Sequence, residues 1–172
     1  GSSALFVQSA GAPGSAGPIT INIGPVPVEG GAGGHALTIL GGTNNTINNA
    51  GTLSTTDGIT GLVISGFGGN NAVVNTGLIV GSIDLGSGNN SLVNVNGGVF
   101  EAGPIVNLGS GVFTNNGVIS PGNLNNVATL AISGNLATTS TSVYALDVQF
   151  SNQTSDLVTV SQSATVNGQV AV

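Results

Sequence analysis

Lysine and arginine are absent from this sequence of 172 residues, which contains six acidic residues and one histidine and has a formal net charge of −6 at pH 7. About a quarter of the residues of an ordinary soluble domain are charged. Proteins that bind nucleic acids neutralise phosphates with basic side chains, and anionic membrane surfaces attract the same side chains. The composition therefore argues against nucleic acids and anionic membranes as partners.

Cysteine is also absent, and aromatic residues make up only 3% of the chain. The fold must therefore be stable without disulfides, although small secreted scaffolds often depend on them. Valine, isoleucine and leucine supply the apolar content instead, and these residues favour strands. No run approaches the roughly 18 apolar residues of a membrane helix, so we expect no membrane insertion by this segment. The start, Gly1-Ser2-Ser3-Ala4, has no basic residue, and we expect no signal peptide there.

Internal repeats organise what is present. Residues 1–11 match residues 58–68, and a partial third copy covers residues 35–42. A second motif consists of an asparagine pair followed by glycine and apolar residues. Its copies begin at Asn44-Asn45, Asn70-Asn71, Asn89-Asn90 and, in a shorter form, Asn115-Asn116. Repeats of about 20 to 50 residues are typical of solenoids, propellers and arrays.

Short strands separated by glycine, asparagine, serine and threonine are expected throughout. We place them at residues 19–23, 37–40, 62–65, 73–75, 83–85, 92–95, 105–108 and 118–119. No segment has helical periodicity, so helices cannot connect parallel strands. The sequence therefore predicts an all-β fold, a right-handed parallel β-helix (β-solenoid) with a single stacked core, no helices of note and roughly eight coils.

Asparagines that recur at one turn can stack from coil to coil, and their side-chain amides then form a hydrogen-bonded ladder. The candidates are Asn48, Asn75, Asn96 and Asn116. The alternative is that these residues are unrelated and serve individual turns in the left-handed conformation.

The chain changes character near Pro121. Residues 1–120 are Gly/Asn-rich repeats with an irregular Gly/Pro-rich loop near 12–34, which contains one strand, and residues 121–172 form further coils. Within the second section, residues 144–150 alternate strictly between apolar and smaller or polar side chains. This pattern predicts one long, half-buried strand. No true domain boundary is expected.

Residues 117–123 (GVISPGN) resemble the G-x-I/L-S-P-G-N element of bacterial autotransporter (type V secretion) passenger domains of the pertactin/AIDA-like β-helix type. The family's next elements are similar to residues 129–136 and 143–160, although Gln162 stands where the family usually has glycine. The resemblance implies a right-handed β-helix that is exported through the inner membrane and then through an outer-membrane barrel formed by the same polypeptide. It also implies a role in adhesion or self-association, since most passengers are adhesins or self-associating factors.

Catalytic and metal-binding patterns are weak. His35 and Asp57 could complete a serine triad only by coincidence, because no G-x-S-x-G motif is present. Asp84 and Glu101 are separated by nearly one coil and could stack as a carboxylate pair, or they could be separate surface acids. Residues 86–92 resemble a calcium-binding repeat, but Asn90 replaces the aspartate that calcium requires. The sequence predicts no enzyme, no cofactor and no metal site.

The expected function is that of an extracellular structural or adhesive stalk segment of a bacterial cell-surface autotransporter, anchored in the outer membrane as part of the full-length protein. The alternative is a self-associating module that mediates cell–cell aggregation, filaments or biofilm, with a possible connection to virulence. The expected partner is accordingly an unknown surface ligand or another copy of the chain, which makes a homo-oligomer possible.

Overall fold

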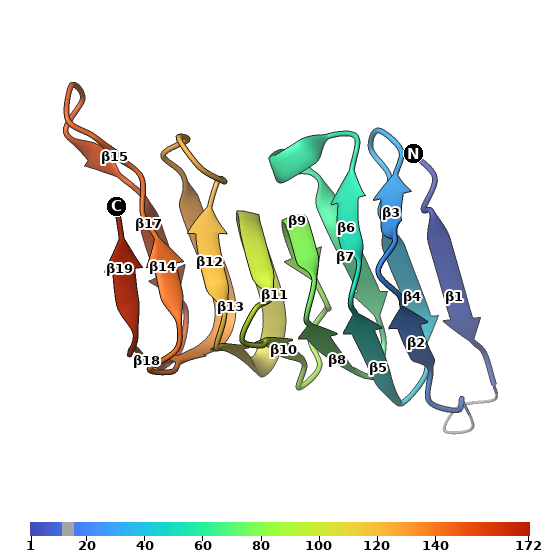
Figure 1. Cartoon of the computed structure of the whole chain (residues 1–172). Coiled ribbons are helices and arrows are strands. Elements are labelled where there is room, and N and C mark those ends of the chain that lie inside the picture. Colours follow the sequence, from blue (N-terminus) through green and yellow to red (C-terminus); the bar gives the residue numbers. More distant parts are fainter. Residues whose placement is uncertain (12–15) are drawn as a thin grey trace.

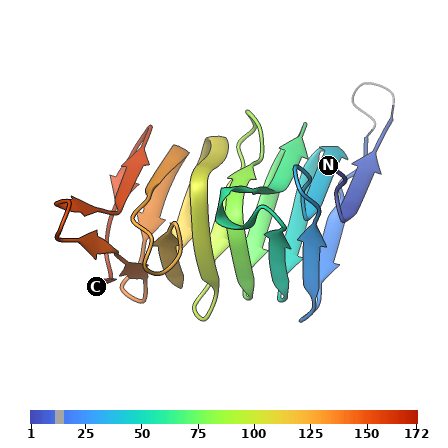
Figure 2. The same ribbon diagram turned by 90° about the horizontal axis from the view of Figure 1, so that it is seen from above.

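The computed structural model describes residues 1–11 and 16–172. The chain winds in successive coils around one axis, from the N-terminal coil at the right of Figure 1 to the C-terminal coil at the left. Figure 2 shows the same stack from above. Seventeen strands join one sheet in which neighbouring coils pair in parallel. Coil-to-coil pairing, not helices or hairpins, therefore builds the molecule.

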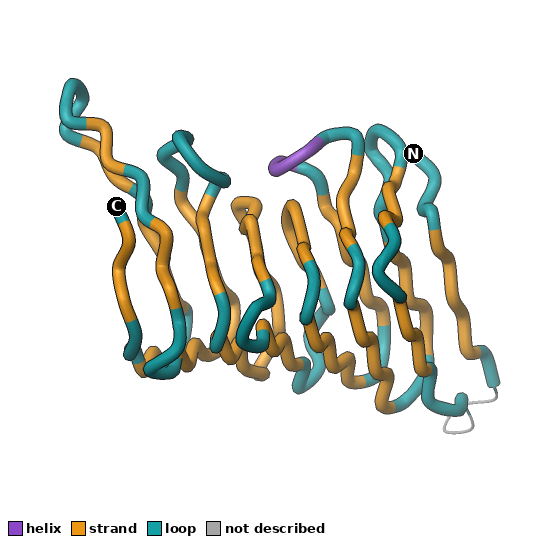
Figure 3. Tube along the Cα trace, in the orientation of Figure 1, coloured by secondary structure: helices purple, strands orange, loops and turns teal. Residues whose placement is uncertain are grey.

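Each coil contributes a strand to three faces, and turns at the corners connect them (Figure 3). Face 1 consists of β1 (Leu5–Ser9), β4 (Leu37–Gly41), β7 (Leu62–Phe67), the end of β9 (Leu78–Asp84), the middle of β11 (Val99–Asn115), the start of β13 (Thr129–Thr138) and β17 (Leu157–Val160). Face 2 consists of β2 (Thr20–Ile23), β5 (Asn44–Asn49), β8 (Asn70–Asn75), β10 (Ser91–Asn94), the ends of β11 and β13, and β18 (Ala164–Thr165).

Face 3 consists of β3 (Pro27–Gly30), β6 (Thr52–Thr55), the starts of β9 and β11, β12 (Val118–Pro121), β14 (Val143–Ala145) and β19 (Gln169–Ala171). The described residues thus make seven coils. The sequence predicted roughly eight coils. Fewer are present because the coils are unequal in length and several contain more residues than eight equal coils would. The separation between stacked residues varies from 19 to 27 along one corner of the coil.

Three apolar rows fill the interior, one behind each face, and each has one member in every coil. The row behind face 1 consists of Leu5, Leu37, Ile64, Ile83, Val106, Ile132 and Val160. The row behind face 2 consists of Ile21, Ile47, Val73, Leu92, Phe113, Leu136 and Ala164. The row behind face 3 consists of Val28, Leu53, Ile79, Phe100, Ile119, Tyr144 and Val170.

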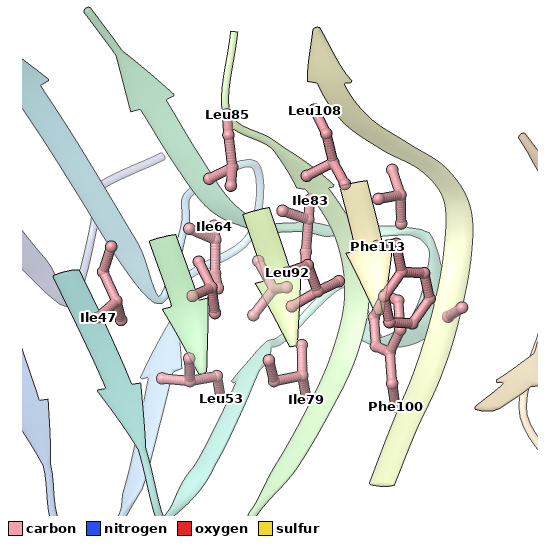
Figure 4. Close-up of a cluster of buried hydrophobic side chains, with 14 of the residues drawn as sticks. Ile47, Leu53, Ile64, Ile79, Ile83, Leu85, Leu92, Phe100, Leu108 and Phe113 are labelled. Atoms are coloured by element: carbon pink, nitrogen blue, oxygen red, sulfur yellow. The ribbon is translucent and has the colours of Figure 1, made fainter. Parts of the chain in front are cut away.

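These rows explain why so few aromatic side chains are needed. Three short strands enclose a narrow interior, and branched aliphatic side chains fill it when they stack on their equivalents in the next coil. Figure 4 shows this cluster, including Phe100 and Phe113, whose rings meet edge to face with centroids 5.8 Å apart. The predicted all-β parallel solenoid with a single stacked core is confirmed.

Two local predictions were wrong. Residues 12–34 contain two strands, β2 and β3, where one strand within a loop was expected, and residues 12–15 lie outside the described residues. Residues 144–150 do not form one strand, because the chain leaves the coil after β14. It then makes an antiparallel hairpin of β15 (Val148–Gln149) and β16 (Thr154–Ser155) before it returns to β17. Phe150, near the hairpin tip, is 85% exposed.

Two further features complete the fold. The division proposed near Pro121 falls inside the stack, where β11 pairs with β13 in parallel. Among the described residues there is one 3₁₀ turn, η1 (Gly58–Thr60), which contacts β9 and β11. In the part of the chain that is described, no helix is long and apolar enough to cross a membrane.

Candidate functional site

The most prominent polar feature is a row of buried asparagines at the corner between faces 2 and 3, which we call the inner ladder. It consists of Asn49, Asn75, Asn94 and Asn115, each at most 1% exposed. Side-chain Nδ2 of each residue donates to Oδ1 of the next, over 2.8 Å, 2.9 Å and 2.8 Å. The row thus runs through four consecutive coils.

Each amide of the inner ladder also holds the turn that follows its strand. Oδ1 of Asn75 accepts the N–H of Gly77, and Nδ2 donates to the carbonyls of Gly77 and Val99. Asn49 bonds to Gly51 and Leu78 in the same way. Because buried main-chain groups without partners are costly, each asparagine secures its own turn and the turn of the next coil together.

A second ladder lies at the corner between faces 1 and 2 and consists of Asn45, Asn71 and Asn90, which are also buried. Nδ2 of Asn45 donates to Oδ1 of Asn71 over 2.9 Å, and Nδ2 of Asn71 donates to Oδ1 of Asn90 over 3.3 Å. The amides again bind nearby carbonyls, for example those of Gly41 and Gly86. Two of the three corners are therefore fixed by stacked amides.

Of the four predicted ladder residues, Asn75 belongs to the inner ladder. Asn48 points outward, lies beside Val74 in the register and pairs with Asn22 on the exposed surface over 2.8 Å. Asn96 is exposed in the turn after β10, and Asn116 is half-buried in the turn after β11. In those coils the ladder position is occupied by the neighbouring Asn49, Asn94 and Asn115.

The sequence does contain a signal for the correct residues. Successive side chains of a strand point to opposite faces, so an asparagine two residues from a core residue must also point inward. The pattern Asn-x-apolar-x-Asn occurs at residues 45–49, 71–75 and 90–94. In each copy the two asparagines belong to the two ladders, and the apolar residue between them belongs to the row behind face 2.

The acidic residues considered as a pair are not brought together. Asp84 lies on face 1, where its Oδ1 accepts the Nδ2 of Asn107 over 2.8 Å and the N–H of Gly86 over 2.9 Å. Glu101 lies on face 3, between Val80 and Ser120 in the register. The two residues therefore do not stack on each other in adjacent coils.

His35 and Asp57 are each held by the main chain. Nδ1 of His35 lies 2.8 Å from the carbonyl oxygen of Leu62, and Oδ2 of Asp57 accepts the N–H of Gly33 over 2.7 Å. Within the described residues, no three His, Cys, Asp or Glu side chains gather into a group that could hold a metal ion. The turn of residues 86–92, which resembles a calcium-binding repeat, places Asn90 in the second ladder.

One carboxylate is buried, at the base of the hairpin. Oδ1 of Asp156 accepts the N–H of Ala128 over 2.8 Å, and Oδ2 accepts the N–H of Asp147 over 3.1 Å. Asp156 therefore joins the segment before β13, the first residues of the hairpin and the start of the last coil. Burial, reinforced by the carboxylate of Asp156, raises the pKa of Tyr144 to about 12.

The last coil leaves an apolar cavity of about 280 Å³ open at the C-terminal end of the stack. Its lining includes Ile119, Leu136, Val158, Val160 and Val170. Nearby Val166 is 73% exposed and Val170 is 63% exposed.

Comparisons of the chain with protein-family models, curated proteins and solved structures gave no match.

Proposed function

We propose that this chain is a structural and adhesive stalk segment of a bacterial surface autotransporter, that it lies outside the cell, and that it performs no catalysis. The observation that carries the proposal is the use of its buried polar side chains. The ladder amides bind one another and the turns of adjacent coils. These buried polar groups therefore hold successive coils together along the axis.

Three other features support the same function. The coils stack along one axis, which separates the two ends of the segment and suits a spacer (Figure 1). The absence of cysteine is compatible with passage through a narrow outer-membrane pore, which a disulfide-closed loop would obstruct. Residues 117–123, which resemble the passenger motif, comprise β12 and the residues that flank it on both sides.

Protease treatment of intact producer cells tests the location. A protease that cuts after aromatic residues is suitable, because the chain lacks lysine and arginine and Phe150 is exposed. The proposal predicts that antibody detection of the chain is lost without cell lysis, and that cells without the gene attach less to glass. A chain that is degraded only after lysis would contradict the proposed location.

The alternative function is a self-associating module. It rests on the same resemblance to autotransporter passengers, which include self-associating factors. Aggregation of producer cells that depends on the gene would support this alternative, whereas attachment to glass without aggregation would favour the stalk.

A further inference from the structure

The turn after β10, in the middle of the stack, differs from the turns at the same corner of the neighbouring coils. In the other three coils of the inner ladder, the ladder asparagine donates to the carbonyl of the glycine two residues further along the chain. Asn94 instead donates to the carbonyl of Gly98, four residues further along. This turn is therefore two residues longer than its equivalents, and its exposed residues are Asn96 and Gly97.

The rest of the molecule does not hold these two residues. No described residue forms a hydrogen bond with the main chain or the side chain of Asn96 or Gly97. Gly97 has a φ of 89°, and a Cβ added to it would meet nothing within 4 Å. The residues on either side are fixed, because the N–H of Val95 donates to the carbonyl of Asn75 over 3.0 Å and the N–H of Gly98 donates to the carbonyl of Val95 over 2.8 Å. The dipeptide is thus a free segment between two anchored ends.

An asparagine that is followed by glycine can convert without an enzyme. The main-chain nitrogen of the glycine attacks Cγ of the asparagine, a C–N bond forms, and the side-chain nitrogen leaves as ammonia with the proton of the attacking N–H. Glycine permits this step because it has no Cβ and its main chain adopts a wide range of dihedral angles. Water then opens the five-membered imide. Cleavage of its bond to Cγ gives aspartate, whereas cleavage of its bond to the main-chain carbonyl carbon gives isoaspartate, in which the chain runs through Cγ.

The sequence contains three asparagine–glycine pairs, and the second lies at the same corner of the next coil. There the N–H of Asn116 donates to the carbonyl of Asn94 over 2.7 Å, and the carbonyl of Asn116 accepts the hydroxyl of Thr141 over 2.9 Å. A Cβ at Gly117 would overlap the carbonyl oxygen of Gly98 in the preceding coil. The second pair therefore has neither the free main chain nor the open space of the first.

The third pair, Asn167 and Gly168, is held by Thr138 of the preceding coil. The hydroxyl of Thr138 accepts the N–H of Asn167 over 2.7 Å and donates to the carbonyl of Asn167 over 2.5 Å. The side-chain NH₂ of Asn167 also donates to the carbonyl of Thr138 over 3.4 Å. Among the three pairs, Asn96 and Gly97 are therefore the one pair that is both exposed and without hydrogen bonds to described residues.

We propose that Asn96 is a site of spontaneous deamidation in the folded protein, where it converts to aspartate and isoaspartate much faster than the other two pairs. The product adds a seventh acid to a chain that has six and contains no lysine or arginine to neutralise it. A depression of about 550 Å³ beside the turn is lined by Leu78, Gly97 and Glu101, among others. The new carboxylate therefore forms at the edge of a surface that already carries an acid. This inference is independent of the proposed function.

Mass spectrometry of the purified chain after incubation at mildly alkaline pH tests the proposal. A protease that cuts after aromatic residues places the three pairs in different peptides, residues 68–100, 114–144 and 151–172. Each conversion exchanges an NH₂ group for OH, and electron-transfer fragmentation locates the change and distinguishes aspartate from isoaspartate. Asn96 should convert at least about tenfold faster than Asn116, because breaking the two main-chain hydrogen bonds of Asn116 slows its conversion by about this factor.

The denatured chain is the matched control for the effect of the fold. Asn96 and Asn116 are then both followed by an unrestrained glycine and should convert at similar rates. Asn96→Gln should abolish the conversion in peptide 68–100, because the longer side chain would have to close a six-membered ring. Asn116→Gln should leave that conversion unchanged.

Circular dichroism verifies that the incubated chain and each variant are folded, and Asn96→Ser replaces Asn96→Gln if the latter is not. The proposal is overturned if Asn116 or Asn167 converts as fast as Asn96 in the folded chain, since the fold would then not select between the pairs. It is also overturned if peptide 68–100 of the folded chain stays unchanged during an incubation in which the denatured chain converts, since the turn would then be protected.

Discussion

A buried asparagine of the inner ladder serves several groups, and its removal should be correspondingly costly. Asn75→Ala removes the Nδ2 donor from the carbonyl of Val99 and from Oδ1 of Asn94. It also removes the Oδ1 acceptor from Nδ2 of Asn49 and from the N–H of Gly77, which then keeps only the carbonyl of Asn49 at 3.2 Å. We expect the free energy of unfolding to fall by about 2–4 kcal/mol, as measured by denaturant titration.

The matched control is Asn48→Ala. Asn48 is next to Asn49 in β5 but points outward, where its amide donates to Asn22, so its loss should change stability by less than about 0.5 kcal/mol. Equal effects of the two substitutions would show that the ladder contributes no more than a surface hydrogen bond.

Tyr144 is the only tyrosine of the chain, so tyrosinate absorbance reports this residue alone. Its hydroxyl is buried and makes no hydrogen bond to any described residue. Burial first and the carboxylate of Asp156 second raise its pKa to about 12, above the ordinary value of about 10. The neutral phenol is favoured in the folded chain, so its contribution to the free energy of unfolding is intact below about pH 10. That contribution is lost as the pH rises toward 12.

Absorbance titration of the folded chain should give a midpoint near 12, and titration in denaturant a midpoint near 10. Tyr144→Phe should remove the corresponding alkaline loss of stability without destabilising the chain at neutral pH, because it removes an unpaired hydroxyl. A folded-state midpoint near 10 would mean that the phenol reaches water.

At the scale of strands and turns, close contact between coils requires glycine at particular positions. A Cβ at Gly111 would overlap the main chain of Asn90 in the preceding coil, whereas a Cβ at Gly31 would meet open space. Gly111→Ala should lower the midpoint of thermal unfolding and cost about 1–3 kcal/mol. Gly31→Ala should be neutral or slightly stabilising. Similar losses at both positions would contradict the close approach of the coils.

The hairpin is tied to the stack through Asp156. In Asp156→Asn the side chain keeps one acceptor oxygen, and its NH₂ group faces the N–H of either Ala128 or Asp147. The loss should be about 1–3 kcal/mol, with faster amide exchange at Ala128 and Asp147. Glu29→Gln, which removes one exposed charge, is the control and should leave both amides unchanged. Unchanged exchange in Asp156→Asn would show that the hairpin is held by other contacts.

Strands with aliphatic sequences could be predicted from the sequence, whereas polar strands could not. β4 and β7 contain several aliphatic residues, but β5 (NNTINN) has one. β5 is a strand because Ile47 and the inward Asn45 and Asn49 stack on equivalents in the next coil. Such long-range support is not visible in local composition.

The prediction of one long strand over residues 144–150 was wrong for the converse reason. Its alternation suits a strand, but the N–H of Leu146 donates to Ala171 and the N–H of Asp147 donates to Asp156, and the chain then turns out of the stack. Among the ladder candidates, the sequence indicated that asparagines stack but not which ones. That choice depends on which residue of each pair points inward, which the alternation around the core residue could have specified.

At the scale of the whole molecule, we infer that the coils are equivalent layers joined by continuous rows and ladders. Deletion of residues 95–115 tests it, because Asn94 and Asn115 are equivalent positions 21 residues apart. The deletion removes one full coil, including both Phe100 and Phe113. The rows then close through aliphatic pairs, with Ile83 against Ile132, Leu92 against Leu136 and Ile79 against Ile119.

The most direct measurement is thermal unfolding of this deletion, followed by circular dichroism, beside a deletion of residues 95–105 that joins positions on different faces. We expect the full-coil deletion to keep a β-sheet spectrum and a single cooperative transition, at a moderately lower temperature because one set of interfaces between coils is lost. The out-of-register deletion should lose the transition. Equal loss of cooperative folding in both deletions would contradict the claim that the molecule is a stack of equivalent coils.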